Sequence, residues 1–367
     1  MAIAPRGIDW AVVLAGGSGT RFWPKSRSAR PKQFLAFGGS LPLLTETLER
    51  TAAVAPAQRT LVITAQAHLA LAQAQSPGVP ADQLVGEPAA RDTAAAIGLA
   101  ATLVAARDPE ARLLVCPADH RIATTAQFAT AARAAAALLD EDPARIVVFG
   151  IAPTGPATGY GYIERGAALG AREGIACHDV ARFHEKPVRA RAEEYLASGR
   201  FSWNAGIFAF RARTVLDEIA RQMPELARGL AEIGAAAGGS GFAATLARVF
   251  PTLPRRAFDH GVMEGAPRRA LVIPAYAWDD VGSFPAIARA RAADADGNVA
   301  LGQLIVEGAR DNIVDAGDGL VALLGVEGLV VVHTPDVTLV CPKERAEEVK
   351  ALLEKLKQRG SAGDRFT

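Results

Sequence analysis

Short apolar strands separated by alanine-rich helices constrain the fold of this chain more than any other feature. Four runs rich in β-branched residues each indicate a buried strand, and they are WAVVLA, RTLVITA, RLLVCPA and RIVVFGI. Stretches with helical spacing separate them, at roughly residues 43–54, 68–75, 93–106 and 126–139. Strand–helix alternation of this length predicts an α/β fold, in which helices cover both faces of a mostly parallel sheet.

Size and charge narrow the possible functions. The chain has 367 residues, half of them hydrophobic, which is enough for one large α/β domain with an appendage or for two domains. Its formal net charge of +1 gives no support for a nucleic acid or a membrane surface as partner. No stretch has the apolar length of a signal peptide or a membrane span. We therefore expect a cytoplasmic protein.

Three dispersed cysteines, Cys116, Cys177 and Cys341, form no CxxC pair. A zinc ribbon or a disulfide framework is therefore not expected, and a reducing compartment fits the pattern.

The composition changes after the segment YAWDDVGSF. Residues 294–342 alternate short apolar runs with Gly, Asp and Asn, and a charged amphipathic helix follows at about residues 343–358. We expect a catalytic domain over residues 1–290 and a β-rich C-terminal domain with a terminal helix over residues 291–367.

A glycine-rich, basic segment follows the first predicted strand directly, and its sequence over residues 14–35 is LAGGSGTRFWPKSRSARPKQFL. Ligands of open α/β sheets bind beyond the carboxyl ends of the strands. Glycines let backbone N–H groups approach phosphate oxygens, because no Cβ obstructs them. Arg21 could bind two oxygens, and Lys32 could supply a movable charge. These features predict a polyphosphate site.

Two familiar phosphate loops do not fit this segment. A Walker loop needs a lysine directly after GxxxxG, and a dinucleotide fingerprint needs a third glycine after GxGxx; both are absent. Taken alone, GGSGTR is equally compatible with an ordinary strand-to-helix turn that carries solvated basic residues.

The longer string resembles the nucleotidyltransferase signature of sugar-nucleotide pyrophosphorylases, and its SRSARPKQFL half resembles the mannose-1-phosphate guanylyltransferase branch. Further similar segments follow in the family's order: GEPAARDTAAAI, VCPADH, TGYGYIE, FHEKP, WNAGIF and WDDVGSF. The resemblance covers residues 10–290 closely and the tail more loosely. It implies a Rossmann-like nucleotidyltransferase fold with a small left-handed β-helix-like C-terminal domain. It also implies Mg²⁺-dependent transfer of GMP from GTP to α-D-mannose 1-phosphate, which gives GDP-mannose and pyrophosphate.

The implied reaction needs no activated side-chain nucleophile. An oxygen of the sugar phosphate attacks the α-phosphorus of the triphosphate in line, and it is already anionic, since a phosphate monoester has a second pKa of about 6. We identify no catalytic triad in the sequence. Catalysis is expected to rest on positioning and on electrostatic stabilisation by backbone donors, cations and a divalent metal.

The resemblance carries specific roles onto residues of this chain. It implies catalytic roles for Arg21, Lys32, Asp119 and Lys186. Asp119 and Asp280 would hold Mg²⁺, which needs only one or two carboxylates besides waters and phosphates. Asp279 is an alternative to Asp280, and no metal role is assigned to His120. The implied nucleotide-binding residues are Leu14, Ala15, Gly16, Gly17, Gly19, Thr20, Glu87, Arg91 and Thr93. The implied sugar-binding residues are Gly159, Tyr160, Glu185 and Asn204.

Several of these assignments have alternatives. Lys25, Arg27 and Arg30 could contact phosphates or be solvated. Neighbouring side chains of an extended segment point to opposite faces, so Glu185 and Lys186 could both serve the sugar only if the chain bends at Pro187.

Asp92 stands where the family more often has Asn. Guanine preference would be in doubt if Asp92 touched the base or the ribose, whereas Asp is equally suitable if this residue caps the next helix.

The overall function also has alternatives. A related transferase would use dTTP or UTP with glucose 1-phosphate, and a non-catalytic sensor would bind GDP-mannose without turnover. Such a sensor would usually have lost phosphate or metal groups, and here they are all present. The C-terminal region implies a homodimer or, alternatively, a lid on its own catalytic domain. Because the sequence ends at residue 367, we expect no fused isomerase domain and transferase activity alone.

Overall fold

The computed structural model describes residues 7–17, 19–37, 39–289 and 291–367, and it divides into two compact units. The first unit comprises Met1–Gly16, Thr47–Ala118 and Ile122–Trp278. The second comprises Gly17–Glu46, Asp119–Arg121 and Asp279–Thr367. Residues 291–367 therefore lie wholly in the second unit. This unit also includes the glycine-rich, basic segment that follows the first strand in the sequence. Ser18 of the glycine loop and Ala290, beside the expected domain boundary, lie outside the described residues.

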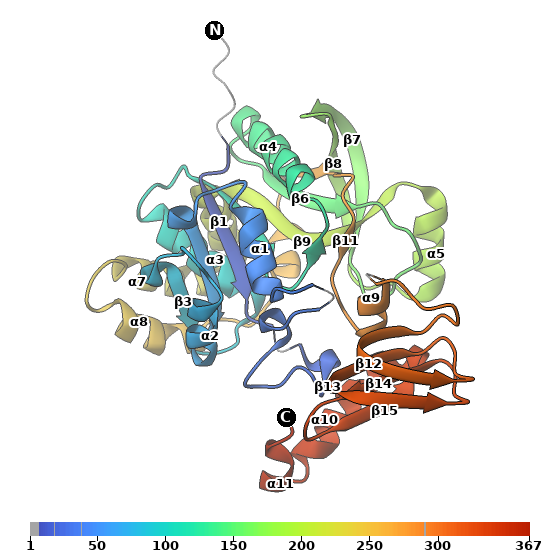
Figure 1. Ribbon diagram of the computed structural model, residues 1–367. Coiled ribbons are helices and arrows are strands. Elements are labelled where there is room, and N and C mark those ends of the chain that lie inside the picture. The colour runs from blue at the N-terminus through green and yellow to red at the C-terminus, as the bar shows by residue number, and fades with distance from the viewer. Residues whose placement is uncertain (1–6, 18, 38, 290) are drawn as a thin grey trace. The chain divides into compact units, whose positions relative to one another are not determined.

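A nine-stranded sheet forms the centre of the first unit, in the order β3-β2-β1-β4-β9-β6-β10-β8-β7 (Figure 1). Its strands are β1 (Trp10–Ala15), β2 (Thr60–Ala65), β3 (Leu84–Glu87), β4 (Arg112–Pro117), β6 (Ile146–Ile151), β7 (Tyr162–Arg172), β8 (Ile175–His184), β9 (Phe201–Arg211) and β10 (Arg269–Val272). Two further strands, β5 (Arg121–Ile122) and β11 (Trp278–Asp279), form a short sheet of their own.

The first four strands of the sheet are parallel, as the strand–helix alternation predicts. β1 pairs in parallel with both β2 and β4, and β2 does so with β3. Beyond β4 the pairing changes, because β9 runs antiparallel to β4, β6 and β7, and β8 runs antiparallel to β7 and β10. The sheet as a whole is therefore mixed: its four neighbouring strands β3, β2, β1 and β4 are parallel, and β6 and β10 form a further parallel pair.

Hydrophobic clusters cover both faces of this sheet. Successive side chains of a strand point to opposite faces, and β4 shows this directly. Leu113 and Val115 belong to one buried cluster, whereas Leu114 and Cys116 belong to another. The first cluster includes residues of α3, α6, α7 and α8, and the second includes residues of α4. Complete burial on both faces explains why these strands are continuous apolar runs.

Helices connect the strands close to the expected positions. The α-helices are α1 (Leu43–Thr51), α2 (Leu69–Ala74), α3 (Asp92–Ala105), α4 (Thr125–Glu141), α5 (Arg189–Ser198), α6 (Ala212–Gln222), α7 (Pro224–Ala235), α8 (Phe242–Val249), α9 (Phe284–Arg289), α10 (Lys350–Lys357) and α11 (Ser361–Asp364). A π-helical turn, η7 (Asp259–Met263), precedes β10. Among the described residues, no helix is long and apolar enough to cross a membrane.

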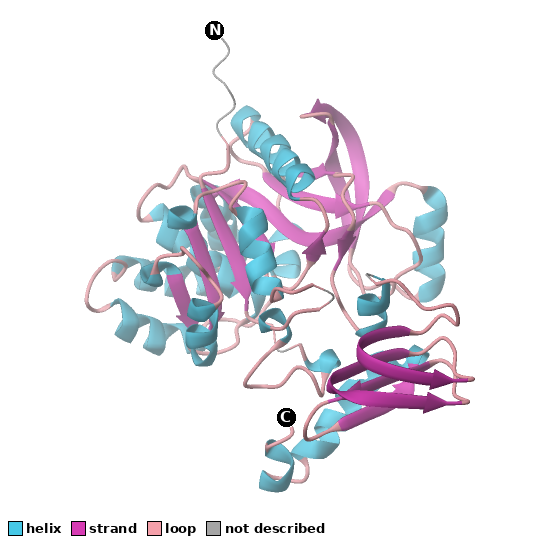
Figure 2. Ribbon diagram, in the orientation of Figure 1, coloured by secondary structure: helices cyan, strands magenta, loops and turns pink. Residues whose placement is uncertain are grey.

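The second unit contains a four-stranded sheet built as a β-helix-like stack (Figure 2). Its strands are β12 (Val299–Glu307), β13 (Ile313–Leu324), β14 (Leu329–His333) and β15 (Thr338–Pro342). β12, β13 and β14 pair in parallel, and β15 closes the sheet antiparallel to β14. A 3-10 helix, η8 (Lys343–Val349), then leads into α10, so the predicted terminal helix is 3-10 over its first half.

Two buried asparagines tie successive turns of this stack together. The Asn312 side chain donates to Asn298 Oδ1 at 2.9 Å and to the Val326 carbonyl at 3.2 Å, while its own oxygen accepts from Leu329 N–H. Asn298 in turn donates to the Ala309 carbonyl at 3.0 Å. Buried turn backbone must find such partners, which explains the Asn residues that interrupt the apolar runs.

The glycine-rich segment and the C-terminal region share one hydrophobic core in the second unit. Phe22, Trp23 and Phe37 of the segment pack in a cluster with Phe284 of α9 and Val349 of η8. Their burial explains why this segment groups with the C-terminal region in the second unit.

Candidate active site

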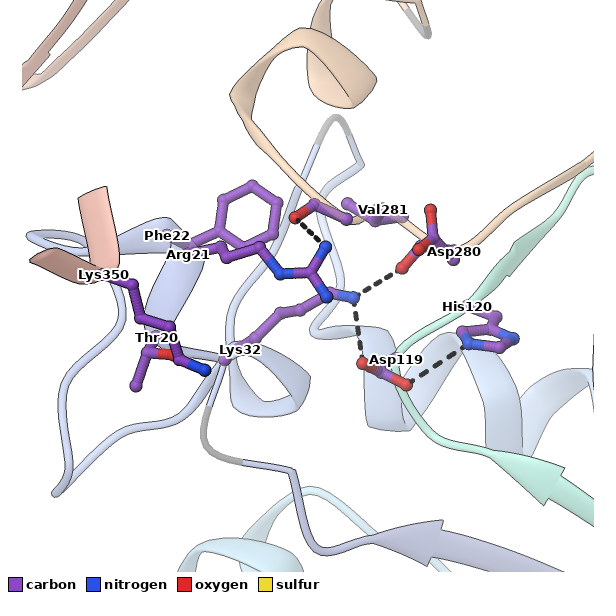
Figure 3. A pocket seen from close by; sticks show the side chains of 11 residues that line it. Thr20, Arg21, Phe22, Lys32, Asp119, His120, Asp280, Val281 and Lys350 are labelled. Carbon is purple, nitrogen blue, oxygen red and sulfur yellow. Dashed lines mark hydrogen bonds and ion pairs between the residues drawn. The ribbon is translucent and has the colours of Figure 1, made fainter. Parts of the chain in front are cut away.

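A pocket of about 360 Å³ lies within the second unit. Four parts of the chain line it: the glycine-rich segment, the turn after β4, the turn after β11, and the first residue of α10. The lining residues are Gly19, Thr20, Arg21, Phe22, Lys32, Asp119, His120, Asp280, Val281, Gly282 and Lys350. The structure thus brings together Arg21, Lys32, Asp119 and Asp280, which are far apart in the sequence (Figure 3).

Gly19 determines the course of the glycine-rich segment. Its φ of 59° lies in the left-handed region, which favours glycine, and it precedes the 3-10 helix η1 (Thr20–Phe22). A Cβ at this position would lie 2.3 Å from Lys32 Cβ. Glycine is therefore needed here for two reasons, the backbone conformation and the close approach of the lysine.

Lys32 is buried with its ammonium directed at the two acidic turns. Only 5% of the residue is exposed, and Nζ donates to Asp119 Oδ2 at 2.9 Å and to the Asp280 carbonyl at 2.6 Å (Figure 3). Burial raises the pKa of the Asp119 carboxyl, but the charges of Lys32 and His120 and the Lys32 hydrogen bond outweigh it, and the net pKa lies below its usual value. Asp119 is therefore a carboxylate at neutral pH.

In the turn after β11, the side chains of the adjacent residues Asp279 and Asp280 lie in different surroundings. Asp279 Oδ1 accepts from Val281 N–H at 2.7 Å, and Oδ2 forms an ion pair with Arg289 at 2.7 Å. Asp280 instead lines the pocket. Val281 has a φ of 46°, an unfavourable conformation for a β-branched residue, and such strain concentrates at functional sites. The Asp279 hydrogen bond holds this turn, and of the two aspartates only Asp280 is among the described residues that line the pocket.

Two further cations complete the pocket. Arg21 donates from Nη1 to the Gly282 carbonyl at 3.3 Å. Lys350, which the sequence interpretation did not single out, extends its ammonium from α10 toward Thr20 (Figure 3). The described lining therefore carries three cations and two carboxylates, a balance that suits a polyanion accompanied by a metal ion.

The carboxylates fit a divalent cation that shares its coordination with a ligand. No group of three or more His, Cys, Asp or Glu side chains in the described ranges is placed to hold a metal by protein ligands alone. A hard cation that keeps waters and phosphate oxygens needs no more than the two acids present. His120 Nε2 lies 3.8 Å from Asp119 Oδ1, a distance that suits charge support of that acid.

The other basic residues of the segment have structural contacts. Lys25 forms an ion pair with the buried Asp315 of β13. Arg27 forms an ion pair with Asp336 at 2.8 Å and donates to the Phe366 carbonyl at 2.7 Å. Neither residue is among those that line the pocket. Arg30 is exposed and does not line the pocket.

A second group of predicted nucleotide-binding residues lies in the first unit, at the carboxyl ends of β1 and β3. Leu14 and Ala15 end β1, and a Cβ at Gly16 would lie 3.2 Å from Glu87 Oε2 at the end of β3. Burial raises the pKa of Glu87 to about 7. This carboxyl can therefore gain or lose its proton near neutral pH.

The start of α3 shows how Asp92 is used. Its φ of 65° lies in the left-handed region, where Asp and Asn are among the most tolerated side chains. Its Oδ1 accepts from Thr93 N–H at 2.9 Å, and Thr93 Oγ1 accepts from Phe258 N–H at 2.8 Å. Asp92 thus stabilises the helix start, although the flanking cap position is Arg91. An acid serves this local role as well as an amide.

The predicted sugar-binding residues gather in the first unit around Asn204. The Asn204 side chain donates to Asp259 Oδ1 at 2.7 Å, and a Cβ at Gly161 would lie 2.8 Å from Glu185 Oε2 and 3.6 Å from Asn204 Cβ. Burial raises the pKa of Asp259, and the charge of Glu185 adds to this effect, although the Asn204 hydrogen bond opposes it. A larger residue at position 161 would require the Glu185 carboxylate to move.

Lys186 resolves the expected conflict with its neighbour Glu185. The bend expected at Pro187 occurs at Lys186 itself, whose φ is 41°. The turn brings Lys186 Nζ to 2.6 Å from Glu185 Oε1. Both side chains therefore lie together after the end of β8, as a shared role would require.

The predicted Gly159–Gly161 turn carries an aromatic contact. The ring of Tyr160 packs edge-on against Trp203 at 5.0 Å and Trp278 at 5.3 Å between centroids. Gly159 is exposed, and a Cβ there would meet no atom within 4 Å. Tyr160 is thus fixed by packing, and Gly159 is free of steric demands.

Two residues of these sites were missed in the sequence. Lys350 lies in a charged helix, where nothing local separates it from other surface lysines. Asp259 lies on the π-helical turn η7, a kind of element that often occurs at functional sites but has no clear sequence signal.

Comparisons with known proteins identify the family of this chain. A nucleotidyl transferase family model matches residues 10–297, and a mannose-phosphate isomerase/GMP-like β-helix domain model matches residues 302–356. The chain is 39% identical to a mannose-1-phosphate guanylyltransferase of Klebsiella pneumoniae, over 95% of this chain and 74% of the relative. It is 38% identical to a mannose-1-phosphate guanylyltransferase of Escherichia coli, with the same coverage.

A solved structure is also similar over nearly the whole chain. This protein of Thermus thermophilus, described as a mannose-1-phosphate geranyltransferase, has a TM-score of 0.84 and 38% identity, and the match covers 95% of this chain and 99% of that one. Matches of this extent, together with the nucleotidyl transferase model over most of the sequence, show the family. The chain belongs to the mannose-1-phosphate guanylyltransferase family of nucleotidyltransferases, and it is an enzyme of that family.

Proposed function

We propose that the protein transfers GMP from GTP to α-D-mannose 1-phosphate and releases pyrophosphate. The observation that carries this proposal is the pocket in which Lys32 contacts both acidic turns while Arg21 lines the same cavity. Such a site would bind and polarise phosphates, and its described lining contains no Ser or Cys that could act as a nucleophile. It therefore suits a reaction in which one phosphate attacks another.

The triphosphate is assigned to the pocket of the second unit. Arg21 and the open glycine backbone bind its phosphate oxygens, and Lys32 neutralises charge at the α-phosphorus. The sugar phosphate oxygen forms the new bond to this phosphorus while the bond to the pyrophosphate oxygen breaks. No protein group needs to accept a proton, because the attacking oxygen is already ionised.

Asp119 and Asp280 are assigned as the residues that hold Mg²⁺. When bound, this ion would neutralise phosphate charge and polarise the phosphorus–oxygen bonds. The lowered pKa of Asp119 keeps this carboxylate ionised at neutral pH, as a metal ligand must be.

Glu87 is assigned to the guanine base. As a carboxylate it would accept hydrogen bonds from the N1 and N2 donors of guanine, which uracil and thymine do not offer in this arrangement. Its position beside Gly16, at the end of β1, supports this role.

The cluster around Asn204 is assigned to mannose. Glu185, Asn204 and Asp259 offer hydrogen-bond acceptors and donors suited to sugar hydroxyls, and Lys186 offers a cation to the sugar phosphate. Lys186 is exposed, so its charge is accessible to an anion.

The proposal is tested by a substrate panel. Pyrophosphate release should be measured with GTP, ATP, UTP and dTTP, each combined with mannose 1-phosphate and with glucose 1-phosphate, in the presence and absence of Mg²⁺. We expect GTP with mannose 1-phosphate to give the highest kcat/KM, and only with the metal. Preference for UTP or dTTP would instead identify another sugar-1-phosphate nucleotidyltransferase, and binding of GDP-mannose without any turnover would identify a sensor.

A further inference from the structure

Lys350 stands out among the cations that line the pocket. It is the first residue of α10, more than three hundred residues after Lys32 in the sequence, and it belongs to the C-terminal part of the second unit. Its side chain lines the same cavity as Arg21 and Lys32. The proposed reaction described above gives it no role.

The ammonium of Lys350 has no partner among the residues that the structure describes, unlike the other two cations of the pocket. Lys32 already donates to Asp119 and to the Asp280 carbonyl, and Arg21 donates to the Gly282 carbonyl. Among the described residues, no protein group therefore competes with a ligand for the three donors of the Lys350 ammonium.

Helix stability does not explain the position of Lys350. A lysine commonly pairs with an acid one turn away on the same helix, and Glu354 stands at that spacing. However, Glu354 Oε1 accepts from Lys357 Nζ at 2.8 Å. Lys350 is thus left facing the pocket although an acid lies within one helical turn.

Packing fixes where Lys350 lies. Its neighbours Val349 and Leu353 are buried in the cluster that also contains Phe22 and Trp23 of the glycine-rich segment. η1 packs against both η8 and α10. This packing holds the start of α10 against the segment, and the Lys350 ammonium lies near Thr20, at the end of the pocket away from Asp119 and His120 (Figure 3).

We propose that Lys350 binds the β- and γ-phosphates of the triphosphate and stabilises the departing pyrophosphate. This inference rests on the proposed function, which assigns the α-phosphorus to Lys32, whose ammonium contacts Asp119 and the Asp280 carbonyl. A triphosphate held there would extend its terminal phosphates toward Thr20 and Lys350. As the bond between the α-phosphorus and its bridging oxygen breaks, the charge that develops on pyrophosphate is neutralised by Lys350, which keeps its proton throughout.

The C-terminal region then contributes directly to substrate binding. It supplies a positive charge at the end of the pocket that is assigned to the leaving pyrophosphate. This charge is carried by α10, which the shared hydrophobic core holds against the glycine-rich segment.

The test uses the reverse reaction, in which pyrophosphate and GDP-mannose are separate substrates. KM values for both should be measured for the full chain and for Lys350→Ala, Lys350→Met and Lys350→Arg. We expect Lys350→Ala and Lys350→Met to raise the KM for pyrophosphate about tenfold, the loss typical of one charged hydrogen bond. The KM for GDP-mannose should change less than twofold, and Lys350→Arg should restore most of the pyrophosphate affinity.

Lys355→Ala is the matched control, because it removes an identical charge from the same helix outside the pocket lining. Equal pyrophosphate KM values in Lys350→Ala, Lys350→Met and Lys355→Ala would overturn the assignment, as would an equal rise in both KM values for the Lys350 variants. Lys350→Met keeps an apolar stem of similar length, so it remains informative if the alanine variant unfolds. If the wild-type protein turns over neither GTP with mannose 1-phosphate nor GDP-mannose with pyrophosphate, the proposed function itself is refuted. If wild-type turnover is normal and the pyrophosphate KM is unchanged in the Lys350 variants, only the role of Lys350 is refuted.

Discussion

The pKa of an acidic side chain is lowered in the pocket of the second unit but raised in the Asn204 cluster of the first unit. In the pocket, the positive charges of Lys32 and His120 overcome the effect of burial and lower the pKa of Asp119. In the cluster, burial and the nearby charge of Glu185 raise the pKa of Asp259. Each acid accepts a hydrogen bond from a side chain, a lysine in one case and an asparagine in the other.

This difference indicates which part of a ligand each region suits. A region with surplus cations and ionised acids can bind phosphates together with a metal ion. A region where acids lie close together and are hydrogen-bonded to an amide suits neutral hydroxyl groups, which both donate and accept. The two regions therefore differ in electrostatic environment although each contains two acidic side chains, Asp119 and Asp280 in the pocket and Glu185 and Asp259 in the cluster.

The largest effect is expected from Lys32→Met, which removes the cation that links the two acidic turns. Loss of one preorganised charge contact costs about 10²–10³ in kcat, and methionine keeps the buried apolar stem. Steady-state assays of pyrophosphate release would measure the change. Lys25→Met is the control, because Lys25 pairs with Asp315 and does not line the pocket. If both variants lost the same activity, the charge of Lys32 would have no special role.

A smaller loss, about 10²-fold in kcat, is expected from Asp280→Asn, because it removes one of two carboxylates assigned to the metal. The variant should also need a higher Mg²⁺ concentration for half-maximal rate. Asp279→Asn should change activity less than about tenfold, since Asp279 contacts Arg289 and Val281 N–H. A metal titration of both variants would measure this difference. The reverse ranking would move the metal ligand to Asp279.

Much of the first unit could be predicted from local sequence patterns. The β1 strand matches its apolar run from Trp10 to Ala15, because strands buried on both faces need continuous apolar residues. β3 was missed, since only Leu84 and Val85 of its four residues are apolar. The antiparallel pairing of β9 with β4 joins distant segments, and no local pattern encodes it.

The candidate site was predictable only where a motif contains the residue. Arg21, Lys32, Asp119 and Asp280 occur in segments that resemble a known signature, and the structure brings them to one pocket. The hydrogen bond from Val281 N–H to Asp279 and the backbone bend at Lys186 could be recognised only in three dimensions. Lys350 reaches the pocket because a hydrophobic core packs α10 against the glycine-rich segment. No spacing of residues in the sequence predicts this packing.

The cluster around Asn204 provides the next test of the comparison. Asp259→Ala should raise the KM for mannose 1-phosphate about tenfold, because it removes an acceptor and leaves the Asn204 amide without its partner. The KM for GTP should be unchanged, since triphosphate binding is assigned to the pocket of the second unit. His260→Ala is the control from the same turn; its side chain is exposed and pairs with Glu264. Equal effects on both substrates would contradict the separation of the two regions.

The smallest expected effect is a pH dependence caused by Glu87, an acid that belongs neither to the pocket nor to the Asn204 cluster. Its pKa of about 7 means that the ionised fraction rises about threefold between pH 6.5 and 7.5. If the carboxylate accepts from guanine, the affinity for GTP should rise by a similar factor over this interval, and Glu87→Gln should remove that part of the change. Binding titrations with GTP, using CTP to correct for ionisation of the phosphates, would measure it.

The raised pKa of Glu87 also predicts the direction in which the free energy of unfolding changes with pH. Between pH 4.5 and 7 the folded protein keeps a proton on Glu87 that the unfolded chain has released, so this residue makes the free energy of unfolding fall as pH rises through that window. Above pH 7 both states are ionised, and its contribution becomes constant. Denaturant titrations of wild type and Glu87→Gln at several pH values should therefore show a difference that changes between pH 4.5 and 7 and is flat above. A constant difference at all pH values would mean that Glu87 titrates normally in the folded protein, and the assignment of a pH-sensitive base contact would fail with it.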